Sequence, residues 1–265
     1  MNLKIEQKRQ RQRPFVKQVS STKRSIRSLV LILSALLFPV TMFYFSPALV
    51  FKGARLSILT GSYITFALLF LVALFFGRKW CAWFCPSGGI SEIVHSARQQ
   101  PFRQNRLKKI KYIIWVLWLA AVTSVVIFVS HGFSSIDPFF ETEKGISIHN
   151  IQLMAVYYVV VGTIVISAIA FGRRGFCHTL CWMAPFMVLG RKVSNALNIK
   201  SMRLTTNQVD CTACGQCERS CPMSLPVKQM IITEQMEHID CILCGSCVTA
   251  CPTQKLSIKM QKPKL

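Results

Sequence analysis

Eight of the twelve cysteines in this 265-residue chain lie in two short runs that have the same spacing. The runs are CTACGQCERSCP, residues 211–222, and CILCGSCVTACP, residues 241–252. Both follow the pattern Cys-x2-Cys-x2-Cys-x3-Cys-Pro. Three thiolates at intervals of three can bind three corners of one iron–sulfur cubane, while the fourth follows a turn and points elsewhere. The pattern therefore predicts two [4Fe-4S] clusters whose ligands are exchanged between the runs.

The predicted ligands divide crosswise, as in the bacterial two-cluster ferredoxins that share this spacing. The first cluster is expected to bind Cys211, Cys214, Cys217 and Cys251. The second cluster is expected to bind Cys241, Cys244, Cys247 and Cys221. Structural zinc commonly takes four ligands from two Cys-x-x-Cys pairs, which fits two identical four-cysteine runs poorly.

The remaining four cysteines form two pairs with the spacing Cys-x3-Cys. The pairs lie in FFGRKWCAWFCPSGG, residues 75–89, and AFGRRGFCHTLCWMAPFMVLG, residues 170–190. They consist of Cys81 with Cys85 and Cys177 with Cys181, and each pair follows Phe-Gly-Arg and a second basic residue. Because residues four apart share one face of a helix, each pair is expected to direct both thiols at one object.

Three interpretations of these four thiols stay open on the sequence. They could hold a third cluster or another metal, form a redox-active set that docks a partner, or serve only in packing. Repetition at matched positions favours the first two. Nearby His95 and His178 are expected to have surface or hydrogen-bonding roles rather than to act as ligands. Trp80, Trp83 and Trp182 are expected to anchor the region at a membrane interface.

The elements that carry these motifs are predicted from four apolar runs. Each is near the length of about 20 residues that crosses a bilayer as a helix, and none contains Asp, Glu, Lys, Arg or His. The runs are 29–51, 56–76, 112–129 and 153–171. Pro39 and Pro47 are expected to kink the first run. A cleavable signal peptide is not expected, because the basic lead and the apolar run are both too long.

Basic residues alternate between the segments that connect these runs. Lys and Arg number nine in the N-terminal tail, two, eight and one in the three loops, and twelve in the C-terminal part. Cytoplasmic segments carry the positive excess, so both termini and all cysteines are predicted on the cytoplasmic side of the inner membrane. Cytosolic thiols are kept reduced, which disfavours disulfides. The basic residues are not gathered into one recognition element, so the net charge of +22 does not predict nucleic-acid binding.

The combination of four apolar runs, two Cys-x3-Cys motifs and two C-terminal cysteine runs resembles the NapH-type membrane ferredoxins. The four-span part is also similar to the membrane cores of NosR- and CcoG-like iron–sulfur proteins. The resemblance covers nearly the whole chain after the basic tail. In one respect the chain differs: Pro86 follows Cys85, whereas Trp182 follows Cys181 and Pro185 comes three residues later.

The expected fold is an all-α membrane domain of four transmembrane helices, arranged as two repeated hairpins, followed by a small α+β two-cluster ferredoxin domain. The expected boundaries are 1–27 for the basic tail, 28–200 for the membrane domain and 201–265 for the ferredoxin domain. Short amphipathic segments, 90–98 and 186–197, are expected after the two cysteine pairs.

The resemblance implies an electron-transfer component of the quinol dehydrogenase type, in which the protein supplies binding and orientation. Its expected partners are membrane lipid, quinone or quinol, and an iron–sulfur or cytochrome subunit. A redox sensor or a maturation factor for a metalloenzyme is the alternative. A transporter is disfavoured because the spans lack ionisable residues. A haem bound by His131 and His149 is disfavoured because both lie outside the predicted spans.

Overall fold

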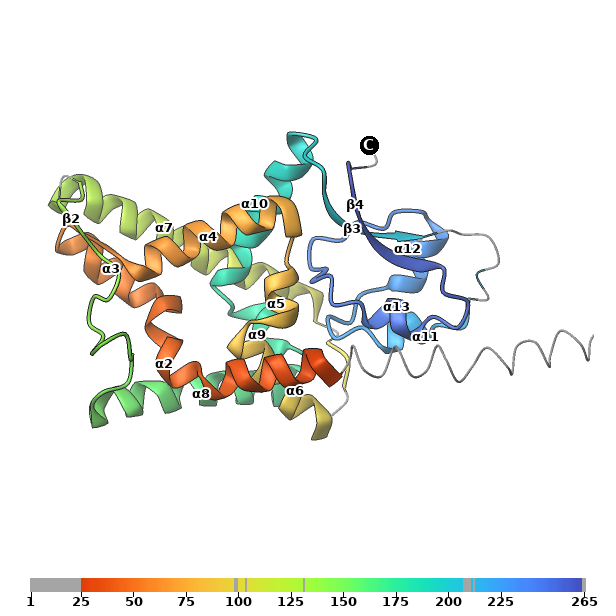
Figure 1. Cartoon of the computed structure of the whole chain (residues 1–265), viewed down its shortest axis with the longest axis horizontal. Helices are drawn as coiled ribbons and strands as arrows, with labels where there is room; N and C mark the ends of the chain where they lie inside the picture. The colour runs from red at the N-terminus through yellow and green to blue at the C-terminus, as the bar shows by residue number, and fades with distance from the viewer. Residues whose placement is uncertain are drawn as a thin grey trace, which may run out of the picture.

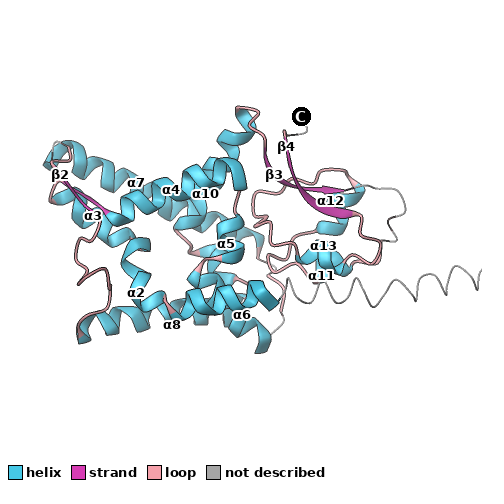
Figure 2. Ribbon diagram, in the orientation of Figure 1, coloured by secondary structure: helices cyan, strands magenta, loops and turns pink. Residues whose placement is uncertain are grey.

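The computed structural model describes residues 25–97, 100–102, 104–130, 132–206, 211 and 213–263. These residues form a helical part, which carries the two Cys-x3-Cys motifs, and a C-terminal part with two paired strands (Figure 1, Figure 2). Most of the predicted basic tail, residues 1–24, lies outside the described residues, as do His131 and the side chain of His95.

Two helices in the described part of the chain are long and apolar enough to cross a membrane. The first, Leu107–Ser130, is built from η2 (Asn105–Lys109), α7 (Ile110–Val125) and η3 (Val126–Ser130), and the second is α8 (Ile151–Phe171). Only 6% and 17% of their most apolar stretches are buried within the protein. Apolar side chains that the protein leaves uncovered suit a lipid environment, so the predicted runs 112–129 and 153–171 are confirmed as helices of spanning length.

The first predicted span, 29–51, is a broken helix in the structure, and its crossing of the membrane as one span remains a prediction. The segment consists of the helix Ser25–Leu36, α2 (Phe38–Thr41), η1 (Met42–Phe45) and α3 (Pro47–Arg55). The first two pieces meet at a bend of 57°. Pro39 lies in the first turn of α2, where its ring and missing N–H prevent a continuous helix, so the predicted kink is confirmed. The backbone is extended at Ser46, and Pro47 then begins a new helix.

The second predicted span is represented by α4 (Gly61–Phe76), which follows the short strand β1 (Ile58–Thr60). With 16 residues, α4 is shorter than the about 20 that cross a bilayer. Phe66, Leu69 and Ala73 are buried on its inner face. The described residues thus contain two helices of spanning length, or three if the bent pair forms one span. Four spans remain a prediction.

The helices that follow the two cysteine pairs pack crosswise. α6 (Pro86–Ala97) packs on α8, and α10 (Met183–Ala196) packs on α4, so each helix contacts the apolar helix that precedes the other pair. Gly190 allows the close approach of α10, because a Cβ atom there would lie 2.6 Å from the carbonyl oxygen of Phe70. The crosswise packing places both cysteine pairs in one core.

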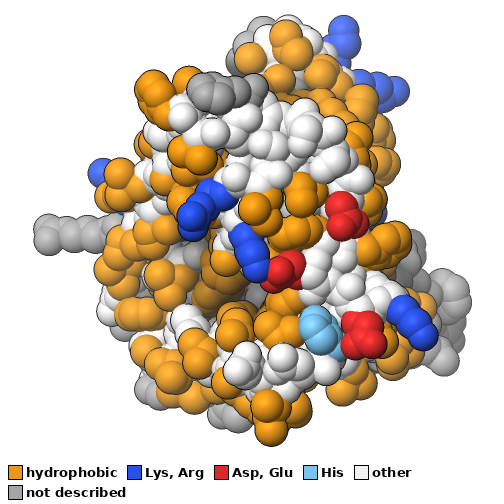
Figure 3. All heavy atoms as spheres, turned by 90° about the vertical axis from the view of Figure 1, so that its left-hand side faces the viewer, with side chains coloured by type: hydrophobic (Ala, Val, Ile, Leu, Met, Phe, Trp, Pro, Cys, Tyr) orange, Lys and Arg blue, Asp and Glu red, His pale blue; other side chains and the backbone are white. Residues whose placement is uncertain are grey.

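The first and third connections meet at the end of the helical part that lies opposite the C-terminal part (Figure 1). β1 pairs in parallel with β2 (Ser135–Asp137), with Ile58 opposite Ser135. Lys52 and Glu141 add an ion pair of 2.5 Å between the two connections. Figure 3 views this end, where apolar side chains surround a few charged ones. The charge alternation also predicts that these two connections lie on one side of the membrane.

The C-terminal part is a small α+β unit, as expected from the sequence. Strand β3 (Ser201–Thr206) pairs in antiparallel fashion with β4 (Leu256–Gln261), and Ser201 lies opposite Gln261. The helices between these strands are α11 (Gln216–Arg219), α12 (Val227–Ile232) and α13 (Ser246–Ala250). The first and last of them follow the turns that carry the predicted cluster ligands.

Candidate functional site

The four cysteines predicted to bind the second cluster line one apolar cavity of the C-terminal part. We call this set the second cluster site; it consists of Cys221, Cys241, Cys244 and Cys247. Leu204, Met223 and Ile258 are among the apolar residues that complete the lining. Gly245 has a φ of 80°, a left-handed conformation that turns the chain into α13 between the second and third ligand of its run. The structure therefore brings Cys221 of the first run to three cysteines of the second run.

Three of the four ligands predicted for the first cluster lie near one another in the structure. The first cluster site is predicted to consist of Cys211, Cys214, Cys217 and Cys251. Burial raises the pKa of Cys217, and Cys214 and Cys251 are close enough for the charge of either thiolate to raise it further. Cys211 and Cys214 are exposed. The first cluster site is therefore the more solvent-accessible of the two.

The thiols of the second cluster site favour their protonated forms when no cation balances their charge. Burial raises the pKa of Cys241 to about 12 and that of Cys221 to about 11, and neighbouring thiols contribute to both increases. Iron binding would replace these protons, because thiolates are the form that ligates metals. Four thiolates are the donor set of a [4Fe-4S] cubane, in which each iron takes one of them.

We expect Cys221→Ser to damage the second cluster and to leave the first more intact. Cys221 lies with Cys241, Cys244 and Cys247, although it belongs to the other run. EPR of the reduced protein should show selective loss of one of the two cluster signals, with Cys217→Ser as the matched variant that removes the other. Loss of the same signal in both variants would contradict the crosswise assignment.

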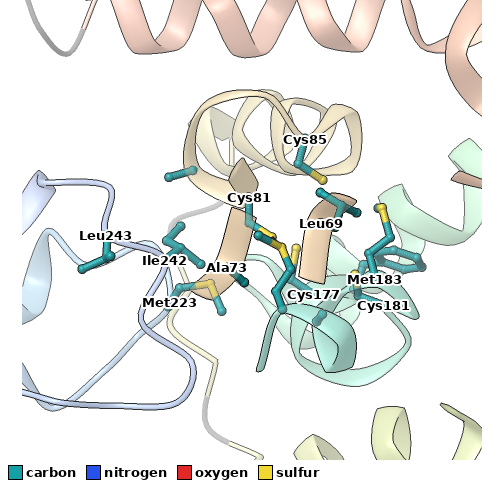
Figure 4. Packing of buried hydrophobic residues seen from close by; sticks show 14 of the residues in the cluster. Leu69, Ala73, Cys81, Cys85, Cys177, Cys181, Met183, Met223, Ile242 and Leu243 are labelled. Atoms are coloured by element: carbon teal, nitrogen blue, oxygen red, sulfur yellow. The ribbon is translucent and has the colours of Figure 1, made fainter. Parts of the chain in front are cut away.

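The four remaining cysteines lie together in the core of the helical part. This four-thiol group consists of Cys81, Cys85, Cys177 and Cys181, whose exposed fractions are 6%, 2%, 5% and 3% (Figure 4). Burial raises the pKa of Cys181, and charge on Cys177 or on the first pair would raise it further, so the pairs lie close in space. The Sγ of Cys81 lies 3.4 Å from the Sδ of Met187, and that of Cys85 lies 3.1 Å from the Oγ of Ser87. All twelve cysteines are free.

Neither pair lies on one helix face, contrary to the sequence-based expectation. Cys81 lies within the one-turn helix α5 (Lys79–Trp83) and Cys177 within α9 (Gly175–Thr179), but Cys85 and Cys181 lie beyond the ends of these helices. Pro86 disfavours helical geometry at Cys85, which explains the first ending. In both cases the second cysteine follows a one-turn helix and precedes a longer helix, α6 or α10. The order of elements around the two pairs is therefore the same.

Several buried charged residues support this core, and their positive charges alone had indicated only the membrane topology. The Nη1 of Arg174 donates to the carbonyl oxygen of Cys81 at 2.8 Å, and its Nη2 pairs with Glu92 at 2.7 Å. Arg27 pairs with both carboxylate oxygens of Glu92, at 2.8 and 2.9 Å. The available signal was a basic residue three positions before the first cysteine of each pair, because Arg78 and Arg174 hold these matched positions and both are buried.

His178 does not have the surface or hydrogen-bonding role expected from the sequence. Its side chain is fully buried, and both ring nitrogens lack a hydrogen-bond partner among the described residues. The ring stacks on Phe102 with centroids 4.3 Å apart. Burial lowers the pKa of His178 to about 3, so the imidazole is neutral at pH 7. The aromatic contact, which links α9 to the connection before α7, is its observed interaction.

The tryptophans beside the cysteine pairs are half-buried and contact the broken first helix. The Nε1 of Trp182 donates to the carbonyl oxygen of Phe45 at 2.7 Å. Trp80 packs against Phe45 and Phe84. Trp83 is also half-buried. These contacts give the rings a packing role, and their predicted role as interface anchors remains a prediction.

Two family models match the chain. A family described as a 4Fe-4S binding domain matches residues 58–109 and 153–200, which contain the two Cys-x3-Cys motifs and their helices. A family described as a 4Fe-4S dicluster domain matches residues 210–256, which contain both cluster sites. No solved structure matches the chain. The chain therefore contains 4Fe-4S ferredoxin-type domains, and helices of spanning length associate it with a membrane.

Curated relatives are distant. The protein named "Putative electron transport protein YccM" of Escherichia coli (strain K12) is 25% identical over 63% of this chain, and the match covers 47% of its own length. "Uncharacterized protein MJ0749" of Methanocaldococcus jannaschii is 24% identical over 84% of this chain and 79% of its own length. A second protein of that organism, "Uncharacterized protein MJ0750", is 26% identical over 61% of this chain and 65% of its own length.

Proposed function

We propose that this protein is a membrane-bound electron carrier that passes electrons between the quinone pool and two [4Fe-4S] clusters. The main support for this proposal is that the four-thiol group and residues of the second cluster site belong to one buried hydrophobic core. Met223 and Ile242 of the C-terminal part lie toward Cys81 in this core (Figure 4). The Cδ1 of Leu243 would lie 3.2 Å from a Cβ atom at Gly77, which directly follows α4. Such packing supports electron exchange between the two parts.

The matched families and the name of one relative support the same proposal. Both family descriptions specify 4Fe-4S binding, and the relative in Escherichia coli carries the words electron transport in its name. The NapH-like architecture and a quinol dehydrogenase role rest on the sequence resemblance. Lipid, quinone or quinol, and an iron–sulfur or cytochrome subunit are the partners proposed with it.

The four-thiol group is proposed to hold a third metal centre or to act as a redox-active thiol set. Two matched segments supply one buried pair each. Burial raises the pKa of Cys81 to about 12, and the positive charges of Arg78 and Arg174 partly oppose that rise. Ligation of a cluster or reversible thiol chemistry would each remove the thiol proton, and the two arginines would then balance the charge of the sulfur. A quinone site near this group, at the cytoplasmic interface, is part of the proposal.

The test of the proposed function is anaerobic purification followed by iron and sulfide analysis and EPR during titration with a quinol. Two cubanes give about eight iron atoms per chain, and a third centre adds to that number. Repeated oxidation of quinol, with electrons delivered to an added acceptor, supports the carrier. Clusters that respond to redox state without repeated turnover would favour the alternative, a sensor or maturation factor.

The proposed topology places the C-terminal part in the cytoplasm and Ser135 on the outer side. Ser135 is exposed in β2, at the end opposite the cluster sites (Figure 1). A cysteine introduced by Ser135→Cys is expected to react with a membrane-impermeant maleimide in intact cells. Gln229→Cys, at an exposed position in the C-terminal part, should react only after the inner membrane is permeabilised. The reverse labelling pattern would contradict the proposed orientation.

A further inference from the structure

A buried carboxylate joins the two parts of the molecule at the second cluster site. Asp240 accepts from the Nζ of Lys111 at 2.8 Å and from the Nη1 of Arg78 at 3.1 Å. The side chains of Lys111, Arg78 and Asp240 are 0%, 2% and 5% exposed. We call these three residues the Asp240 triad. Ion pairs buried to this degree are held in place, because each charge would be costly to leave unpaired.

The sequence positions of the triad connect the four-thiol group with a cluster ligand. Asp240 directly precedes Cys241, and Arg78 lies three residues before Cys81. Arg78 also donates to the carbonyl oxygen of Ile239 at 3.4 Å. Lys111 lies in the first turn of α7. The triad thus fixes the backbone of one cluster ligand against two elements of the helical part.

A second contact fixes the cross-run ligand of the same cluster site. The Nη1 of Arg173, from the second Phe-Gly-Arg segment, donates to the carbonyl oxygen of Arg219 at 2.5 Å and to that of Cys221 at 3.5 Å. The N–H of Phe102 donates to the Oγ of Ser224 at 3.0 Å. Both cysteine-pair segments therefore place an arginine against the second cluster site, whereas two cysteines of the first cluster site are exposed.

We propose that Asp240 is a positioning residue: the Asp240 triad holds the second cluster site against the helical part, so the second cluster exchanges electrons with the membrane and the first with a soluble partner. The inference rests on the proposed function. Oxidation of one quinol to quinone releases two electrons and two protons. Each cluster takes one electron, the first cluster by way of the second, and the protons leave to water. Electronic coupling falls steeply with distance, so the order of the clusters follows from their placement.

The positioning role is tested with Asp240→Asn in the full-length protein with its clusters assembled. The variant leaves two buried cations without a counter-charge, and their repulsion should move the second cluster site from the helical part. Quinol-driven reduction is expected to slow by at least about tenfold, because its rate depends on how the groups that exchange electrons are positioned. The second cluster's potential should rise relative to the first, because a negative charge beside Cys241 is lost. Reduction by dithionite should still reach both clusters.

Two further variants separate positioning from loss of folding. Asp240→Asn combined with Lys111→Met restores the net buried charge of the triad to its original value, and it should recover most of the quinol-driven rate. Glu237→Gln is the matched control, since Glu237 bonds Arg191, Arg203 and Asn195 but its side chain is 39% exposed. It should have nearly the original rate and cluster potentials.

The order of the clusters is tested by removing the second cysteine of each run. Cys244→Ala should prevent quinol from reducing the remaining first cluster, whereas Cys214→Ala should leave the second cluster reducible by quinol. The opposite pattern would overturn the proposed order. A potential of the second cluster that does not change in Asp240→Asn, together with an unchanged quinol-driven rate, would overturn the positioning role. If quinol fails to reduce the original protein, the proposed function is wrong. The role of Asp240 is then decided by a mediator titration, which shows whether Asp240→Asn shifts the potential of the second cluster and not that of the first.

Discussion

The variant Cys81→Ser with Cys181→Ser is expected to lose quinol-driven reduction of its C-terminal clusters while keeping both clusters filled. The two thiols come from different segments, and both are buried in the four-thiol group. Their removal takes one sulfur from each pair without touching any predicted ferredoxin ligand. If the group is the relay between quinol and the second cluster site, the rate should fall by about a hundredfold or more.

The substitution is conservative in size, which keeps the structural cost low. A serine hydroxyl buried without a partner costs about 1–3 kcal/mol, so detergent-solubilised protein should remain folded. Thr179→Ser is the matched control, because Thr179 is buried between the cysteines of the second pair and bonds the carbonyl oxygen of Gly175. It should keep the original rate of quinol-driven reduction.

Iron analysis of the same variant separates the interpretations of the four-thiol group. If the variant loses iron that the original protein holds in addition to its two C-terminal clusters, and the rate of quinol-driven reduction also falls, the group holds a third metal centre. An unchanged iron content with loss of rate indicates redox-active thiols. A double variant that reduces its C-terminal clusters from quinol at the original rate would falsify the relay and leave packing as the role of the four thiols.

The second large effect is expected for Glu92→Gln, which should destabilise the helical part by about 3–5 kcal/mol. Glu92 is the shared partner of Arg27 and Arg174, whose side chains are 10% and 2% exposed. Removing its charge leaves two buried guanidinium groups without a counter-charge. Arg174 also donates to the carbonyl oxygen of Cys81, so the four-thiol group should be disturbed as well. Chemical denaturation in micelles measures the loss.

Glu141→Gln is the control for this variant. Glu141 pairs with Lys52 on the surface, where their side chains are 39% and 51% exposed, so its loss should cost less than about 1 kcal/mol. Equal destabilisation by both substitutions would show that the buried position of Glu92 has no special importance.

Acid should remove the contribution of Glu92 in the original protein. Burial alone would raise the pKa of Glu92, but Arg174 and Arg27 together lower it below its usual value. Because the folded-state pKa is the lower one, the stabilisation is present above the unfolded-state pKa and is lost as pH falls through the folded-state pKa. Between neutral pH and pH values below about 4, the free energy of unfolding should therefore fall more in the original protein than in Glu92→Gln.

The sequence by itself determined the parts of this protein that depend on short-range spacing. Two cysteine runs of identical spacing predicted the two cluster sites, and a turn at Gly215 or Gly245 lies between the second and third cysteine of each run. Apolar composition likewise predicted the helices Leu107–Ser130 and Ile151–Phe171, because a long apolar helix needs no distant partner to satisfy its backbone.

Only the tertiary structure decided how the apolar runs divide and what surrounds the thiols. Composition does not show that α4 is shorter than the other apolar helices, or that α10 packs on it. Composition also does not show that Arg78 and Lys111 are buried and pair with Asp240, which lies 162 and 129 positions away in the sequence. A count of charges cannot distinguish a basic residue that faces water at the end of a span from one that pairs with a buried carboxylate. The difference arises from packing between distant segments, and in this protein that packing brings the cysteine pairs and the second cluster site into one core.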